Sequence, residues 1–388
     1  MSGKDQRKYH NYKNYQKAQK NPKKPKGGRK PKKFTVFLTA LILISIGVFA
    51  GYQALLPADQ DNPTDTDQED NRQAEVEQDR SRVEAGTEET VPKSPYTGLP
   101  IEDESLQRPF ALLIDNHPDA RPPYGIQDAS YVYEIIAEGG VTRLLSIFHE
   151  GRDANYGPIR SLRPYYAHLA RENDAIMAHC GESHQTSALL WQDGYDNICE
   201  HTYTQFYSRD NTLSAPHNLF TNLQELKNGA RDRGLYRETE IEPLFEISED
   251  DNEESNRGSV EVGRVEVPFS KHNHVSYEWD DSREGYLRSI NGSSHTDAYH
   301  GEQIQVNNII VQYASFEFIS DVHRKYHITG SGDGVLIQNG EAKEITWEKG
   351  SYDEDTKFRH KDGSEVKIVP GNTWIHILSP QKQIIIDG

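Results

Sequence analysis

The feature that most constrains this chain is an apolar run without a single charge over residues 34–56. About 20 helical residues are enough to cross the hydrocarbon core of a bilayer, so the run predicts one transmembrane helix. Residues 1–33 carry thirteen lysines and arginines against one acid. Because basic flanks remain in the cytoplasm, we expect a basic cytoplasmic tail over 1–33 and an extracytoplasmic remainder over 57–388.

Cleavage is the alternative to a retained anchor. Residues 48–50 fit a signal-peptidase site before Gly51, and cutting there would give a secreted protein. A lipid anchor would need a cysteine at the end of the apolar run, and the two cysteines are Cys180 and Cys199. The tyrosines between the lysines of the tail allow nucleic-acid binding, although attraction to anionic lipid explains the same charges. No nucleic-acid partner is expected for the exported part.

Charge also divides the exported part, in a chain of 388 residues with a formal net charge of −18. Residues 57–95 hold twelve acids, four bases and few large apolar side chains, which predicts a disordered acidic stalk. A second acidic stretch over 249–258 predicts a linker. The flanking regions, 96–248 and 259–388, are each long enough for a domain of ordinary size.

Region 96–248 mixes strand and helix patterns. Runs of branched and aromatic residues predict strands at 110–116, 129–138, 142–150 and 175–181. Helical spacing predicts one helix over 161–172, capped by Ser161, and another from Leu219 that is ended by Gly229. We therefore expect an α/β or α+β domain. Over 259–388 short strand patterns alternate with turn residues, which predicts a β-rich domain.

Polar residues follow the first predicted strand. The segment begins with Asp115, Asn116 and His117 and reaches Arg121, and open α/β sheets bind ligands beyond the carboxyl ends of their strands. A side-chain turn before the prolines is the alternative interpretation. Glu134 lies inside the next predicted strand. The sequence contains no phosphate-binding loop, nucleophile elbow or HExxH motif.

Two arginines stand at a predicted helix start. Arg160 and Arg163, with Ser161 between them, lie where free N–H groups and the helix dipole favour an anion. Guanidinium groups match phosphate and carboxylate geometry. The alternative is a salt bridge within the domain. Arg143 follows a glycine-rich connection that could simply be a hairpin.

Further candidates precede the second predicted helix, where Arg209, His217 and Asn218 occur. His217 could act as a general base near Asp115 or Glu134, or could have no catalytic duty. Segment 179–184 could offer metal ligands but lacks a clear third one, and the two cysteines could bridge, so no metal, cofactor or disulfide is assigned. The candidate catalytic residues are Asp115, Glu134 and His217. The candidate ligand-binding residues are Asn116, His117, Arg121, Arg143, Arg160, Ser161, Arg163, Arg209 and Asn218.

Six blocks occur in order after residue 96: ALLIDNHPDARP, YE, EGGVTR, GPIRSLR, AHCGES and APHN. The chain resembles the YerB-like lipoprotein family of bacteria from about Tyr96 to its end. The resemblance implies an extracytoplasmic location and separate N- and C-terminal domains, and it implies no known activity. The chain departs from the lipoprotein pattern in having an anchor in place of a lipidated cysteine and in its acidic insertion near 249.

Three functions are compatible with these features. The first is a membrane-anchored envelope protein that binds an anionic ligand, such as a wall glycan or a phosphorylated precursor, through Arg160, Arg163 and Arg209. The second is a transferase or hydrolase acting on envelope polymers, with Asp115, Glu134 or His217 as acid or base. The third is a structural partner of other envelope proteins that uses its β-rich region as the contact surface.

Overall fold

The structure is a computed structural model that describes residues 91–101, 108–152, 154–237, 242–248, 259–321 and 323–388. The expected tail, the apolar segment 34–56 and the acidic linker 249–258 lie outside the described residues. Among the described residues, no helix has the length and apolar character needed to cross a membrane. The predicted end of the stalk, residue 95, lies too late in the sequence. Ser94 is already part of the fold, because it is 2% exposed and its carbonyl accepts a backbone hydrogen bond from Gly98 at 2.8 Å.

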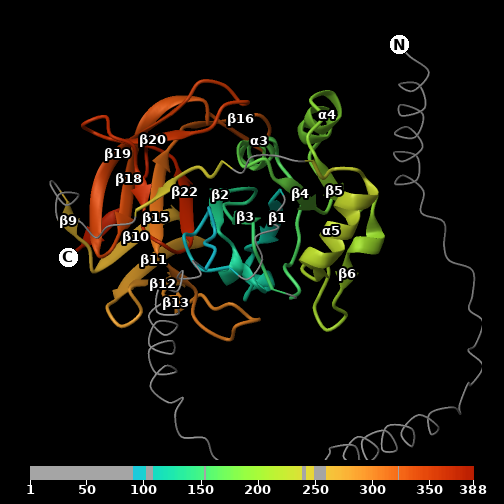
Figure 1. The fold of residues 1–388 in the computed structure, drawn as a ribbon, viewed down its shortest axis with the longest axis horizontal. Coiled ribbons are helices and arrows are strands. Elements are labelled where there is room, and N and C mark those ends of the chain that lie inside the picture. The colour runs from blue at the N-terminus through green and yellow to red at the C-terminus, as the bar shows by residue number, and fades with distance from the viewer. Residues whose placement is uncertain (1–90, 102–107, 153, 238–241, 249–258, 322) are drawn as a thin grey trace, which may run out of the picture. The chain divides into compact units, whose positions relative to one another are not determined.

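The main sheet has eleven strands and draws on both predicted regions (Figure 1). From the first region come β1 (Phe110–Asp115), β2 (Tyr131–Ile136), β3 (Thr142–Phe148), β4 (Ile176–His179) and β5 (Asn197–Cys199). From the second come β9 (Val260–Glu261), β15 (Asn308–Tyr313), β18 (Gly330–Gln338), β19 (Glu341–Lys349), β20 (Lys357–His360) and β22 (Thr373–Leu378). The order is β20-β19-β18-β15-β22-β2-β3-β1-β4-β5, with β9 on β19.

The two predicted regions therefore share one sheet. They meet where β2 pairs in parallel with β22, which sets Glu134 beside His376 in the register. The acidic stretch 249–258 thus separates two regions of the sequence whose strands belong to one continuous sheet.

A second sheet packs against one face of the first. It is formed by β10 (Arg264–Ser270), β11 (Asn273–Asp280), β12 (Gly285–Ile290), β13 (Ser293–Ser294), β14 (Gln305–Val306) and β23 (Ile385–Asp387). Alternate residues of β1 divide between two cores. Leu112 and Ile114 pack in the cluster that contains Val265 and Val267 of β10, whereas Leu113 packs on the opposite face.

Three helices lie among the described residues, α3 (Pro164–Glu172), α4 (His184–Gln192) and α5 (Leu223–Asp232). The expected cap of α3 is wrong, because Arg163 is the cap residue and Ser161 Oγ donates to the carbonyl of Cys180 at 2.8 Å. The expected stop of α5 is also wrong. Gly229 lies within this helix, where an added β-carbon would come 2.9 Å from the ring of Phe206.

Short elements complete the described fold. They are the 3₁₀ turns Pro118–Ala120, Ile126–Asp128 and Thr204–Phe206, and the pairs β6 (Ser208–Arg209) with β7 (Leu219–Phe220), β8 (Glu246–Ile247) with β21 (Lys367–Ile368), and β16 (Phe316–Phe318) with β17 (Arg324–Tyr326). The parallel part of the sheet near β5 matters most for the site. Because β1, β4 and β5 run parallel to one another, their carboxyl ends lie at the same edge.

Candidate functional site

The site is organised around Asp115, the last residue of β1, which is 3% exposed. Its Oδ2 atom lies 2.7 Å from Nδ1 of His217 and 3.0 Å from Nε of Arg160. Its Oδ1 atom accepts the backbone N–H of His117 at 3.0 Å. The carboxylate is therefore held by one imidazole, one guanidinium and one amide.

The imidazole of His217 is fixed in orientation. Its side chain is 13% exposed and stacks on the ring of His117, with centroids 4.8 Å apart and 16° between the planes. Since Asp115 accepts from Nδ1, the neutral ring carries its lone pair on Nε2. The pair is thus an oriented carboxylate and imidazole of the kind that general bases use.

A second polar group lies beyond β4 and β5. Arg209 approaches Oε1 of Glu200 at 3.3 Å and donates to Oδ1 of Asn218 at 3.1 Å. The other carboxylate oxygen of Glu200 lies 3.4 Å from Sγ of Cys180. Because Asn218 is the neighbour of His217, Arg209 links this group to the Asp115 group along the same edge.

The two arginines of the predicted pair contact different carboxylates. Whereas Arg160 contacts Asp115, Arg163 Nε lies 2.5 Å from Oε1 of Glu138, and Arg143 Nη2 lies 2.8 Å from Oε2 of the same residue. Burial alone would raise the pKa of Glu138, but these two arginines hold that pKa below its usual value. The salt-bridge alternative therefore describes Arg163, and Arg143 makes a second salt bridge to the same carboxylate.

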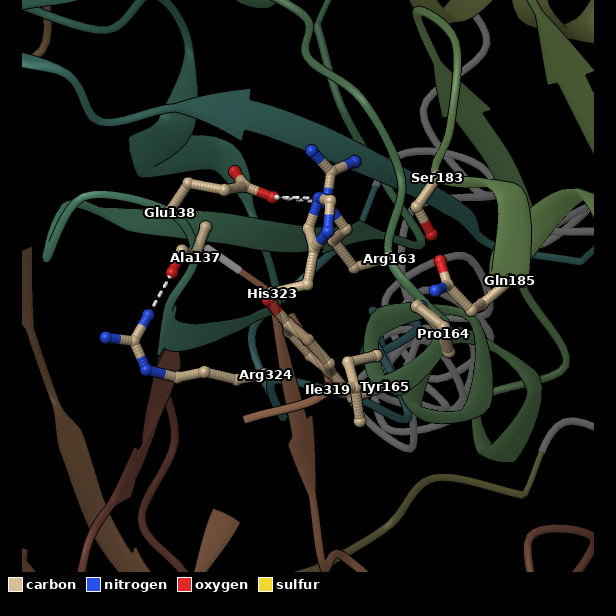
Figure 2. Close-up of a pocket in the computed structure, with 10 residues that line it drawn as sticks. All are labelled: Ala137, Glu138, Arg163, Pro164, Tyr165, Ser183, Gln185, Ile319, His323 and Arg324. Carbon is tan, nitrogen blue, oxygen red and sulfur yellow. Dashed lines mark hydrogen bonds and ion pairs between the residues drawn. The ribbon is translucent and has the colours of Figure 1, made fainter. Parts of the chain in front are cut away.

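Figure 2 shows the hollow in which Arg163 meets Glu138. The N-terminal turn of α3 and the cap and first turn of α4 line it on one side. On the other side His323 Nε2 lies 3.7 Å from Glu138, and Arg324 donates to the carbonyl of Ala137. Asp115, Arg160 and His217 are not among the residues that line this hollow.

Glu134 is not at the edge but is fully buried between the two sheets. Its Oε2 atom lies 2.8 Å from Nη2 of Arg288 and 3.3 Å from Nδ1 of His376, and its Oε1 atom accepts from Thr142 at 2.7 Å. Burial would raise the pKa of Glu134, but Arg288 and His376 outweigh it and hold the pKa well below its usual range. This carboxylate is an internal ion-pair partner.

Asn116 and Arg121 belong to the same internal network. The side chain of Asn116 donates to Glu134 at 3.2 Å, and its carbonyl oxygen accepts from Arg121 Nε at 3.0 Å. Successive residues of a strand point to opposite faces, so Asn116 follows Leu112 and Ile114 toward the second sheet. Asn116 and Arg121 therefore lie with Glu134 in the internal network and not with the contacts of Asp115.

Both cysteines are free thiols. Burial, followed by the charge of Glu200, raises the pKa of Cys180 to about 11, and burial and Glu182 raise that of Cys199 to about 12. Reactive cysteines have lowered pKa values. Neither thiol has the environment of an activated nucleophile.

The chain is similar to known proteins over most of its length. Residues 96–236 match the "Protein of unknown function (DUF3048) N-terminal domain", and residues 265–375 match the C-terminal domain of the same family. The chain belongs to the DUF3048 family. The "Putative lipoprotein YerB" of Bacillus subtilis (strain 168) is 33% identical over 292 residues, which cover 74% of this chain and 86% of that protein.

A solved structure supports the same assignment. The crystal structure of the YerB protein from Bacillus subtilis matches with a TM-score of 0.66 and 30% identity, over 76% of this chain and 99% of that one. The resemblance seen in the sequence is confirmed. The DUF3048 description gives no activity, so the chemistry must be inferred from the residues of the site.

Proposed function

We propose that this DUF3048 protein is an extracytoplasmic envelope protein, held in the membrane by residues 34–56, that binds an anionic ligand at the carboxyl edge of β1, β4 and β5. A wall glycan or a phosphorylated precursor is the ligand class. The apolar run supports the anchor. The lipoprotein name of the Bacillus subtilis relative supports a place at the envelope.

The observation that carries the ligand proposal is the shared use of Asp115 Oδ2 by Arg160 and His217. A guanidinium has five N–H donors in a planar fork. In Arg160 the Nε atom lies in an ion pair with Asp115 without a hydrogen bond, and Nη1 approaches the carbonyl of Pro216 at 3.5 Å. We assign the Nη2 donors to the ligand, with the half-exposed Arg209 as the second cation.

The binding test compares the two arginines of the predicted pair. The full chain in detergent is titrated with inorganic phosphate, a polyprenyl phosphate analogue and soluble wall fragments, and its melting temperature is followed. A ligand that binds the native state raises this temperature by mass action.

Arg160→Ala should abolish the shift. Arg163→Ala is the matched control and should keep it, because Arg163 is committed to Glu138. Since loss of Arg160 also leaves the buried Asp115 with one cation fewer, Arg209→Gln provides a second test at a more exposed side chain. A shift of wild-type size in both Arg160→Ala and Arg209→Gln would refute the proposal.

A hydrolase or transferase is the second candidate, favoured by the 2.7 Å contact between His217 and Asp115. In this mechanism His217 Nε2 takes a proton from the attacking group, Asp115 stabilises the resulting imidazolium, and Arg160 stabilises developing negative charge. Asp115→Asn and His217→Gln should each abolish turnover of a labelled precursor. Turnover that survives both changes contradicts the assignment. Partner binding through the β-rich region stays a prediction.

A further inference from the structure

Three potential metal ligands lie together where β4 and β5 end. Cys180 follows β4, and Glu200 and His201 follow β5, the neighbouring parallel strand. Cys180 Sγ lies 3.4 Å from Glu200 Oε2 and 3.7 Å from His201 Nε2, and these last two atoms are also 3.7 Å apart. The three donor atoms thus form a nearly equilateral triangle.

This triangle has the size of one face of a metal tetrahedron. With metal–ligand distances of about 2.3 Å to sulfur and about 2.0–2.1 Å to nitrogen and oxygen, tetrahedral ligand atoms lie about 3.3–3.6 Å apart. Shifts of a few tenths of an ångström would therefore bring all three donors to bonding distance. We propose that Cys180 Sγ, Glu200 Oε2 and His201 Nε2 bind a divalent transition-metal ion of the zinc class, with the fourth position open.

Neighbouring contacts hold the ligands in place. Arg209 engages Glu200 at Oε1, so it orients the carboxylate while Oε2 faces Cys180. Outer contacts of this kind fix metal ligands in known sites. Gly181 has a φ of +67°, and a β-carbon there would lie 2.8 Å from Cε1 of His201, so glycine allows the ring to approach the backbone.

A thiol–imidazole nucleophile does not fit these atoms. In such a site the carboxylate orients the ring nitrogen remote from the thiol. Here Glu200 Oε2 approaches the same Nε2 atom of His201 that Cys180 approaches. Convergence on one point is the arrangement that a metal requires.

Two other groups of donor atoms fit less well. His179 Nδ1 lies 2.9 Å from the carbonyl of Gly181, so this nitrogen carries the proton and cannot bind a metal beside Glu182 and Cys199. In the group of His117, Asp119 and His217, the two rings are stacked. Stacked rings direct their in-plane lone pairs side by side rather than toward one ion.

The test uses Co²⁺, because a thiolate ligand gives it a charge-transfer band in the near ultraviolet. The full chain in detergent, kept reduced by a non-thiol reductant, is titrated with Co²⁺, and Zn²⁺ is then added. We expect the band to saturate at one Co²⁺ per chain and to disappear when Zn²⁺ displaces it.

Cys199→Ser is the matched control, since it removes the other thiol and should keep the band that Cys180→Ser abolishes. Glu200→Gln and His201→Gln should weaken Co²⁺ binding. If Cys180→Ser lowers the melting temperature of the metal-free chain, its loss of the band could reflect a damaged fold, and these two variants then decide the assignment. The proposal is overturned if folded wild-type protein gives no thiolate band, or if Cys199→Ser abolishes it. Arg209 contacts both proposed sites, whereas Arg160 contacts Asp115 and none of the three metal ligands, so Arg160→Ala should leave the band unchanged.

Discussion

The buried pair of Glu134 and Arg288 gives the sharpest test of the fold, because it joins the two predicted regions through charges that are both 0% exposed. Two opposite charges about 4 Å apart attract by about 4 kcal/mol at the effective dielectric typical of proteins. Removing one partner of a buried pair costs about 3–5 kcal/mol, since the other charge is left unpaired. Arg288 also packs over Trp374, with its guanidinium carbon 4.4 Å from the ring centroid.

We therefore expect Glu134→Gln and Arg288→Met each to lower the free energy of unfolding by about 3–5 kcal/mol. The double variant should lose less than the sum of the two, by about 2–3 kcal/mol, because no unpaired charge remains. The assay is urea unfolding of all four proteins, followed by far-ultraviolet circular dichroism, with equal slopes as the check on comparability.

Additive losses, within about 0.5 kcal/mol, would show that the two charges are not coupled and would refute this reasoning. If Arg288→Met fails to fold, Arg288→Lys replaces it, since it keeps the charge and loses the planar fork. The experiment also tests the earlier assignment of Glu134 as a catalytic residue. A Glu134→Gln protein of unchanged stability would return that residue to the list of candidates.

Three further predictions concern single sites. The pKa of His168 is lowered to about 4, mainly by burial, so the unfolded state takes up the proton first as the pH falls. Stability should therefore decline between about pH 6.5 and pH 4 by up to about 1.4 kcal/mol per unit, and urea midpoints of His168→Gln should show a shallower decline. Gly181→Ala should lower stability more than Gly194→Ala. Both positions have a left-handed backbone, which costs an L-residue about 1–2 kcal/mol, but Gly194 (φ +68°) has nothing within 4 Å of an added β-carbon, whereas at Gly181 that carbon meets His201. Thermal unfolding of the two variants measures the difference. Asn222 accepts a backbone N–H of the first turn of α5 at 2.8 Å, so Asn222→Ala should cost about 1 kcal/mol in urea unfolding, and an unchanged midpoint would contradict the cap.

Local patterns were sufficient for much of the secondary structure. The runs of branched and aromatic residues at 110–116, 129–138 and 142–150 correspond to β1, β2 and β3 with small changes at the ends. The helix α4 was missed because its segment begins with the polar run after Cys180, which is typical of a turn. Strand β5 has only three residues, too few to show a period.

Partners of charged residues could not be read from the sequence. Arg163 forms its salt bridge with Glu138, which is 25 positions earlier, and Glu134 forms one with Arg288, which is 154 positions later. Both contacts depend on which strands pair, and pairing order is a long-range property of the sheet. The excess of acids made a salt bridge available to every arginine, so charge alone could not separate a ligand-binding guanidinium from a structural one.

The structure does support one rule about where such sites occur. Residues within strands, such as Glu134, point into a core on one face or the other and are committed to internal partners. Residues that end or follow parallel strands, such as Asp115, Cys180 and Glu200, are brought to one edge whatever their distance in sequence. The signal that identifies them is a polar residue directly after a buried strand. Had the short strand before Glu200 been recognised, that rule would have placed Glu200 and His201 beside Cys180 and supplied the metal ligands that segment 179–184 lacks by itself.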